Sequence, residues 1–187
     1  YEAPGDGDYY HLALSSQKPV VMEPFAYDVN GVSTLMTTLA VPIIVDGQVK
    51  GVAGVDIGLS DMAAQMAAIQ PLGTGYVALL SADGLFVSHP DPTFLGLHFA
   101  EKVANPETWR AMIANPGQAV ELAGSGGEAR LAVSVPVRLL DNNSWHMVVS
   151  VPEATVYAYL TRMVWTSLAI ICCSALLLVL LGVTISG

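Results

Sequence analysis

The C-terminal end of the chain carries the feature that most constrains its fold. No charged side chain occurs between Met163 and Val183, where the sequence reads MVWTSLAIICCSALLLVLLGV. At 1.5 Å per residue, a helix of this length spans the hydrocarbon core of a bilayer, which is roughly 30 Å thick. A soluble protein would have to bury a helix that is apolar on every side inside a small domain. The run therefore predicts a transmembrane helix that anchors a globular domain.

The rest of the chain is acidic. The 187 residues include 16 Asp and Glu against 7 Lys and Arg, which gives a formal charge of -9. This balance argues against binding to nucleic acid phosphates or, through the folded part, to anionic lipid headgroups. Both cysteines, Cys172 and Cys173, lie inside the apolar run. We interpret them as small apolar filler rather than as a disulfide or a metal site.

The two ends of the sequence bear on the orientation of the anchor. The chain starts at Tyr1 and stops at Gly187, soon after the apolar run, so we expect it to be an excerpt of a longer protein. Arg162 precedes the run and no Lys or Arg follows it. Taken alone, the positive-inside tendency would place the globular part in the cytoplasm. One Arg beside a cut end gives this orientation little weight.

Strand patterns dominate the first sixty residues. Two β-rich runs, Val32–Ile44 and Val49–Ile57, flank Asp46-Gly47, a pair that predicts a hairpin turn. Pro42 limits its strand to an edge or a bulge at that point. The stretch SDMAAQMAAI predicts a helix with Ser60 as its N-cap.

A second set of strands begins at Tyr76. Strands are predicted over residues 76–80, 85–88, 118–122, 130–139 and 145–151. Asn105-Pro106-Glu107 predicts a helix start with Asn105 as the cap, and the helix should end near Ala114. Antiparallel strands with one or two short helices indicate an α+β fold.

An internal similarity refines the domain organisation. The segment around Pro42 is similar to the segment around Pro136, about 94 residues later, and each reads strand, turn, strand. A period of this size indicates two related modules in tandem. We predict the C-terminal part of a first module over residues 1–70, a complete second module over 71–155, and a juxtamembrane segment with the transmembrane helix over 156–187.

Several stretches resemble the double Cache family, extracytoplasmic sensor domains of bacterial chemoreceptors and sensor kinases. Tyr9-Tyr10-His-Leu-Ala13 resembles the family's W-Y-x-x-A, and Val21-Met-Glu23-Pro24-Phe25 resembles its T-E-P-Y. The segment VPIIVDGQVKGVAGVDI resembles the central hairpin of the family. Gly75 to Asp83-Gly84 with His89-Pro90 resembles the start of the membrane-proximal module, and Trp145–Pro152 resembles the last strand before the second transmembrane helix. The resemblance covers nearly the whole chain.

This resemblance implies a PAS-like antiparallel sheet with flanking helices in each module, followed by one C-terminal transmembrane helix. It also implies a sensor part in the bacterial periplasm, anchored in the inner membrane, with ligands bound in the membrane-distal module. We expect a small-molecule ligand, contact with membrane lipid through Met163–Val183, a homodimer, and no cofactor or nucleic acid partner.

The resemblance also identifies candidate ligand-binding residues. Family members that bind amino acids carry an Arg for the ligand carboxylate and an Asp in the GVDI segment for its ammonium. The Asp is present as Asp56, whereas the Arg position holds Gly7. A carboxylate with an aromatic wall suits an ammonium group, and a bidentate guanidinium suits a carboxylate. We therefore predict an amine or amino-acid-like ligand at a site made of Tyr9, Tyr10, Phe25, Tyr27, Asp28 and Asp56.

Each of these residues has a plainer alternative. Asp56 can instead cap the helix near Ser60 or end its strand, and the tyrosines can be ordinary half-buried aromatics of a sheet. The sequence shows no catalytic set, since it has no G-x-S-x-G elbow and no phosphate loop after Gly124–Gly127. His89, Asp91 and His98 read as a turn rather than a metal site.

The leading hypothesis is the sensing domain of a methyl-accepting chemotaxis receptor, which is not itself an enzyme. The first alternative is the sensor region of a histidine kinase or a diguanylate cyclase, whose catalytic domain would follow residue 187. The second alternative is a membrane-anchored solute-capture or adhesive domain without an output.

Overall fold

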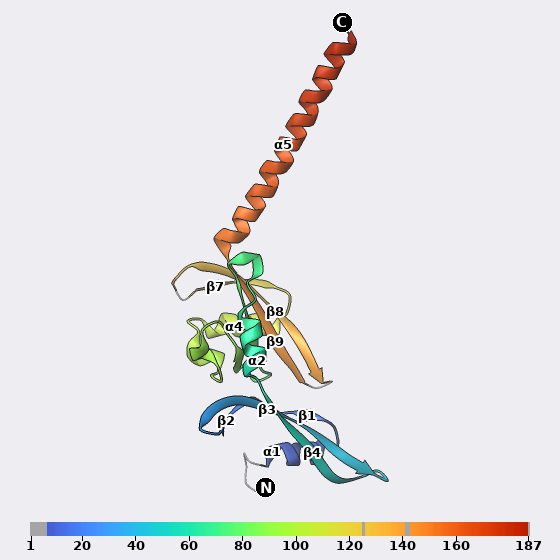
Figure 1. Cartoon of the computed structure of the whole chain (residues 1–187), viewed down its shortest axis with the longest axis vertical. Coiled ribbons are helices and arrows are strands. Elements are labelled where there is room, and N and C mark those ends of the chain that lie inside the picture. The colour runs from blue at the N-terminus through green and yellow to red at the C-terminus, as the bar shows by residue number, and fades with distance from the viewer. Residues whose placement is uncertain (1–6, 125, 141–142, 187) are drawn as a thin grey trace.

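Two antiparallel sheets and one long helix follow one another along the molecule. The computed structural model describes residues 7–124, 126–140 and 143–186, with side chains as far as residue 175. Sheet A, made of β1 to β4, lies at one end, sheet B, made of β5 to β9, lies in the middle, and helix α5 projects away from the other end (Figure 1). The predicted α+β fold is confirmed.

Sheet A is organised around one long strand. Its strands are β1 Val20–Val21, β2 Phe25–Val29, β3 Val32–Val45 and β4 Gln48–Gly58, and β3 pairs antiparallel with the other three. The predicted hairpin at Asp46-Gly47 is confirmed, with φ of 51° and 73° at these two residues, the left-handed values that a type I′ turn requires. Strand β2 was not predicted, although Asn30-Gly31 after it is the same kind of turn signal.

The β3–β4 hairpin contains a one-residue irregularity near its tip. Ile44 pairs with Val49, but Ile43 pairs with Gly51, so Lys50 is left as an extra residue on β4. Pro42 lies just beyond this shift and pairs with Val52. The expectation that Pro42 lies at an edge or a bulge agrees with this position. Proline has no backbone N–H, so it cannot donate a hydrogen bond to a neighbouring strand.

Two helices differ from the sequence predictions: the one that packs on sheet A and the one that follows β4. Residues Asp8–Ser16 form helix α1, a segment in which no helix was predicted. Helix α2 spans Ser60–Ala67, but Leu59 occupies the N-cap position and no side chain caps the helix. Ser60 is therefore the first helical residue and not the cap. The buried side chain of Leu59, 3% exposed, explains the difference, because its packing fixes where the chain enters the helix.

Sheet B follows the predicted strands closely. Its order is β6-β5-β9-β8-β7, and its strands are β5 Tyr76–Leu80, β6 Phe86–Ser88, β7 Ala119–Ala123, β8 Ala129–Leu140 and β9 Asn143–Pro152. Short helices connect them: η1 Pro71–Gly73, η2 Pro92–Phe94, α3 Phe99–Lys102 and α4 Pro106–Ala114. Asn105 stands at the predicted N-cap of α4, but its side chain makes no capping hydrogen bond.

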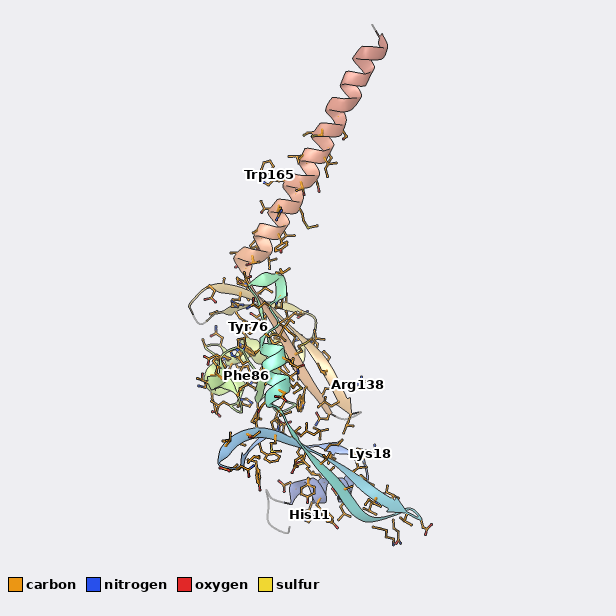
Figure 2. All side chains as sticks on the ribbon, viewed as in Figure 1. His11, Lys18, Tyr76, Phe86, Arg138 and Trp165 are labelled. Carbon is orange, nitrogen blue, oxygen red and sulfur yellow. The ribbon has the colours of Figure 1, made fainter. Side chains whose placement is uncertain are left out.

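Helices cover both faces of sheet B. On one face, Leu80, Phe86 and Val148 form a buried core with residues of α3 and α4, including Trp109 and Met112. Figure 2 labels Phe86 within this core and Tyr76 at its margin.

On the other face, Leu79, Val87 and Trp145 pack with Leu59 and with methionines of α2. Val21 and Leu35 of sheet A pack against the same cluster, so it joins the two sheets. We call this group of side chains the junction cluster.

Helix α5 continues directly from β9. It spans Glu153–Ser186, and its portion Glu153–Ala175 is long and apolar enough to cross a membrane, with none of that stretch buried. Trp165 on this helix is exposed and points away from both sheets (Figure 2). An apolar helix without protein packing on any side is stable only in an apolar solvent such as a bilayer.

We expect Gly75→Ala to destabilise the fold where η1 meets sheet B. A Cβ at position 75 would lie 2.7 Å from the backbone oxygens of both Pro71 and Ser150, which cannot move without disturbing β9. The expected loss of unfolding free energy is about 1–3 kcal/mol, the usual cost of overpacking. Thermal unfolding of the 187-residue chain in detergent, followed by circular dichroism, measures it.

Gly58→Ala is the matched control, because nothing lies within 4 Å of a Cβ there. Equal melting temperatures for the two variants would contradict the prediction.

Candidate functional site

One face of sheet A brings together most of the side chains that the sequence singled out. Residues directly opposite each other in antiparallel strands share a face, and alternate residues along a strand do too. Asp56 lies opposite Thr38, and Phe25 lies opposite Met36, two residues before Thr38. Tyr27, two residues after Phe25, is on this face as well. Because helix α1 packs on it, we call it the α1 face.

Helix α1 places an aromatic ring close to Asp56. Ala13 of the helix and Ala40 of β3 are both fully buried, which marks where the helix meets the sheet. Tyr9 lies one turn before Ala13 on the same side of the helix. A Cβ on Gly54 would lie 3.5 Å from Cε2 of Tyr9, so the ring occupies the space that a side chain at position 54 would fill. Gly54 is two residues from Asp56 on the same face.

Within the described part of the chain, one side chain holds the carboxylate of Asp56. The hydroxyl of Thr38 donates to Oδ1 of Asp56 at 2.6 Å, and Asp56 is exposed. Asp56 does not cap helix α2, whose N-cap makes no side-chain hydrogen bond, and β4 continues past it to Gly58. An oriented carboxylate beside an aromatic ring is an arrangement that attracts a cation.

The other predicted site residues come from helix α1 and strand β2. Tyr9 and Tyr10 lie on α1, so they are not the sheet aromatics of the alternative interpretation, and Tyr10 is half-buried. Phe25 and Tyr27 are exposed on the α1 face and come from β2, on the far side of β3 from Asp56. Asp28 lies on the opposite face, where its Oδ1 accepts a hydrogen bond from the β2–β3 turn at 2.6 Å. The structure does not bring Asp28 to the other residues.

Two residues of this site were not identified from the sequence. Thr38 fixes Asp56, and Gly54 makes room for Tyr9. If residues are paired one by one outward from the Asp46-Gly47 turn, Thr37 falls opposite Asp56. The extra residue on β4 shifts this pairing by one, so that Thr38 lies opposite Asp56. The pairing that defines the site was therefore hidden from simple hairpin geometry.

The opposite face of sheet A meets sheet B through polar contacts as well as the junction cluster. Oε1 of Glu23 accepts a hydrogen bond from the backbone N–H of Asp83 at 3.3 Å, and Nδ2 of Asn143 donates to the carbonyl of Val21 at 3.1 Å. Three buried atoms here, Oε2 of Glu23, Oδ1 of Asn143 and Nε1 of Trp145, have no hydrogen-bond partner in the described part of the chain. Each costs stability relative to a paired group.

The electrostatics of Glu23 follow from this position. Burial raises the pKa of its carboxyl group, and the nearby charge of Asp83 raises it further. Hydrogen bonds from the side chain of Ser81 and from the backbone of Asp83 partly offset the rise.

The histidines considered for a metal site have local partners. Nδ1 of His98 accepts from the backbone N–H of Ala100, and Nδ1 of His89 accepts from that of Asp91. Oδ1 of Asp91 accepts from both the backbone and the hydroxyl of Thr93. Among the described residues, no group of three metal-binding side chains is present.

Comparison with known proteins connects this geometry to a family. Residues 1–64 match the family model described as the first PDC sensor domain of methyl-accepting chemotaxis protein-like receptors. Methyl-accepting chemotaxis protein PscA of Pseudomonas syringae pv. tomato is 26% identical over 156 residues, which cover 82% of this chain and 23% of PscA. The predicted resemblance to sensor domains of chemotaxis receptors is confirmed.

Solved structures of sensor domains share the fold. The ligand-binding domain of PctB, an amino acid chemoreceptor of Pseudomonas aeruginosa PAO1 in complex with L-Arg, is 25% identical with a TM-score of 0.62. The match covers 83% of this chain and 63% of that domain. The extracellular domain of the histidine kinase candidate mmHK1S-Z3 is 25% identical with a TM-score of 0.71, over 84% of this chain and 57% of that one. The chain thus spans under a quarter of PscA and about six-tenths of these solved domains.

We expect Glu23→Gln to change how stability depends on pH. Because the pKa of Glu23 is raised in the folded state, the folded protein binds this proton more tightly than the unfolded chain does. Its contribution to stability is therefore complete below the usual value of 4.5 and is lost as the pH rises through the folded pKa. As the pH rises through this window, the melting temperature of Glu23→Gln should increase progressively relative to that of the native chain. Thermal unfolding at a series of pH values measures the difference.

Asp83→Asn is the companion variant, since it removes only the smaller, charge-related cause and should give a weaker trend of the same sign. A difference between native and Glu23→Gln that stays constant with pH would refute the assignment.

Proposed function

We propose that this chain is the small-molecule sensing part of a bacterial transmembrane chemoreceptor of the methyl-accepting type. The match of residues 1–64 to the chemotaxis sensor model and the likeness to PscA and PctB support this function. In this proposal residues 1–70 are the C-terminal part of a membrane-distal Cache module and 71–155 are the membrane-proximal module. Residues 156–187 are the juxtamembrane segment and transmembrane helix.

The same proposal places the two sheets outside the cytoplasm. Sheet A lies at the end of the molecule farthest from α5 (Figure 1). With α5 in the inner membrane, sheet A is the part that reaches deepest into the periplasm, where it meets solutes first. We further propose that the receptor acts as a homodimer.

The ligand that fits the α1 face best is a cation without a carboxylate. The observation that carries this choice is Asp56, oriented by Thr38 and flanked by the ring of Tyr9 over Gly54. The position where amino acid sensors of this family carry an Arg is Gly7, which offers no side chain. An amine or a quaternary ammonium uses the carboxylate and the aromatic ring, and leaves no carboxylate of its own unpaired.

A continuous path leads from this face to the membrane helix. Strand β4 leads through Leu59 of the junction cluster into α2, which packs on β5 and β6 of sheet B. Strand β9 of the same sheet runs directly into α5. A ligand that binds one arrangement of sheet A more tightly than another shifts the population of both sheets and of α5 by that difference in affinity.

A second candidate function is the sensor region of a membrane histidine kinase or diguanylate cyclase. The likeness to the extracellular domain of mmHK1S-Z3 favours the kinase. The sensing chemistry on the α1 face is the same in both cases, because the output domain differs and not the sensor.

We expect isobutylamine, but not L-valine, to raise the melting temperature of the 187-residue chain in lipid nanodiscs. The two compounds differ only in the carboxylate, for which the α1 face offers no guanidinium. At a hundred-fold excess over Kd, a ligand stabilises the folded state by about 2.7 kcal/mol, a shift of several degrees. Asp56→Ala should abolish the shift, and Thr38→Val should reduce it, because Asp56 then loses the group that orients it.

Asp28→Ala is the matched control, since it removes an aspartate from the opposite face and should leave the shift intact. An isobutylamine shift that survives Asp56→Ala, or a shift with L-valine alone, would rule out this binding mode.

A further inference from the structure

Sheet B has a cavity of its own, separate from the α1 face. It encloses about 420 Å³ on the face that α3 and α4 cover, at the edge of the buried core. A volume of this size is in the range of pockets that bind small organic molecules.

Aromatic side chains form one wall of the cavity. Tyr76, His89, Phe94 and Trp109 all line it. The ring of His89 stacks on Phe94, with centroids 4.1 Å apart and planes 15° apart, and meets Tyr76 edge to face at 5.2 Å. Burial lowers the pKa of His89, so its ring is neutral at pH 7. Nδ1 of His89 lies within hydrogen-bond distance of both the backbone nitrogen and the backbone oxygen of Asp91, at 3.0 Å and 3.2 Å.

A buried guanidinium also lines the cavity. The side chain of Arg130 is only 9% exposed and lies over the ring of Tyr76, at 4.7 Å from its centroid. Nε donates to the hydroxyl of Ser150 at 3.0 Å, and Nη2 donates to the carbonyl of Ser150 at 3.2 Å. These bonds fix one edge of the guanidinium to β9 and turn Nη1 toward the cavity side, where it meets Glu128.

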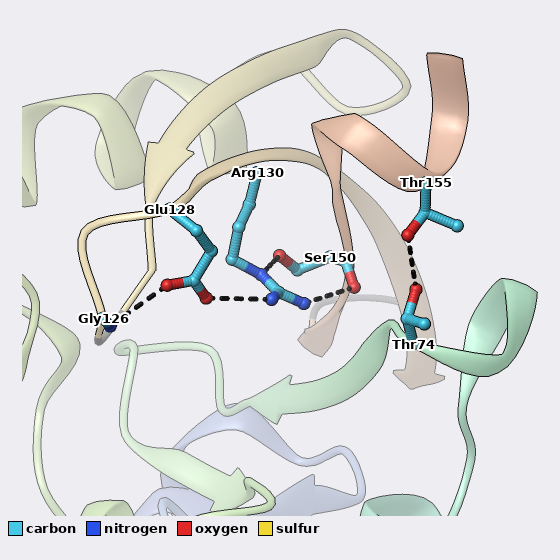
Figure 3. A network of polar contacts seen from close by, with 6 residues as sticks. All are labelled: Thr74, Gly126, Glu128, Arg130, Ser150 and Thr155. Carbon is cyan, nitrogen blue, oxygen red and sulfur yellow. Dashed lines mark hydrogen bonds and ion pairs between the residues drawn. The ribbon is translucent and has the colours of Figure 1, made fainter. Parts of the chain in front are cut away.

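Glu128 is the replaceable partner of Arg130. Its carboxylate lies 3.2 Å from Nη1, yet its side chain is 45% exposed and belongs to the turn between β7 and β8 (Figure 3). Its Oε2 also accepts a hydrogen bond from the backbone N–H of Gly126 at 3.1 Å. Because this carboxylate is half exposed, solvent screening limits what the pair contributes to stability. The buried Arg130, in contrast, needs an anion, because an unpaired charge at such a site is costly.

We propose that this cavity is a second ligand site, which binds a small carboxylate with an apolar or aromatic body. The ligand carboxylate takes the place of Glu128 on Nη1 of Arg130, and its body lies against the aromatic wall. A planar carboxylate matches the guanidinium geometry.

The remaining charges around the cavity favour an anion over a cation. Lys102 lines it, and its Nζ lies 5.6 Å from the centroid of Phe94. Asp91 is the other acid of the lining, and its carboxylate already accepts two hydrogen bonds from Thr93. Two acids, Asp91 and Glu128, and two cations, Lys102 and Arg130, line the cavity, so a move of the Glu128 carboxylate into solvent leaves the cations in excess.

The site lies beside the N-terminal end of α5. Arg130 pairs with Pro152 on β9, the residue immediately before α5 begins at Glu153. The hydroxyls of Thr74 and Thr155 form a hydrogen bond of 2.8 Å between η1 and the first turn of α5 (Figure 3). A ligand on Arg130 therefore acts on the strand that leads into the helix, without passing through sheet A.

The test uses benzoate, benzamide and benzylamine, which share a ring and differ in charge. Isothermal titration of the 187-residue chain in nanodiscs should detect binding of benzoate and at least about ten-fold weaker binding of benzamide. Glu128→Ala removes an exposed competitor and should tighten benzoate binding by about two- to five-fold. Arg130→Gln should weaken it by about ten-fold or more. Asp56→Ala should leave it unchanged, which separates this site from the α1 face.

Arg110→Gln is the matched control, because Arg110 forms an ion pair with Glu107 on the surface of α4 and does not line this cavity. Glu128→Ala keeps the test decisive even where Arg130→Gln fails to fold. The proposal is overturned if benzoate does not bind, if benzamide or benzylamine binds as tightly, or if Glu128→Ala fails to tighten binding. It is also overturned if Arg110→Gln and Arg130→Gln weaken benzoate equally.

Discussion

The junction cluster is the interaction on which the arrangement of the two sheets depends. Leu59, Leu79, Val87 and Trp145 are each buried, and Val21 and Leu35 reach them from sheet A. Burial of a large apolar side chain contributes about 1.5–3 kcal/mol, so the cluster holds the sheets together far more strongly than the few polar contacts beside it. This apolar contact joins sheet A to the rest of the molecule, together with the polar contacts of Glu23 and Asn143 and the chain itself.

Some polar groups around the junction cluster lower the stability of this contact. Glu23, Asn143 and Trp145 each keep one buried polar atom without a partner in the described part of the chain. Such groups lower the stability of the arrangement seen here, and another arrangement that pairs them loses less. In the proposed function, such unpaired groups reduce the free-energy difference between this arrangement and one in which they are paired.

The two proposed sites reach α5 by different routes. In the proposed function the α1 face acts through the junction cluster, whereas the Arg130 cavity lies next to the strand end from which α5 begins. Their chemistry is complementary, since Asp56 suits a cation and Arg130 suits an anion. A receptor with both sites would combine two unrelated chemical signals on one helix.

Much of this architecture could be predicted from local sequence alone. The uncharged run fixes α5, since no small domain can bury such a helix. Asp46-Gly47 fixes the hairpin, and most strands of sheet B follow from their β-rich patterns. Helix α1 was missed, because its segment is short and its helical state depends on packing of Ala13 against Ala40.

The candidate sites depended on tertiary structure. Asp56 was found by its motif, but its face was decided by the extra residue Lys50, because a shift of one residue moves a side chain to the other side of the sheet. Arg130 was read only as the start of a strand, and its role arises from neighbours on β5 and β9 that are distant in sequence. Local sequence patterns were enough to predict most of the strands and one helix that suits a membrane. Only the fold decided which side chains meet, because strand register and long-range packing are properties of the whole sheet.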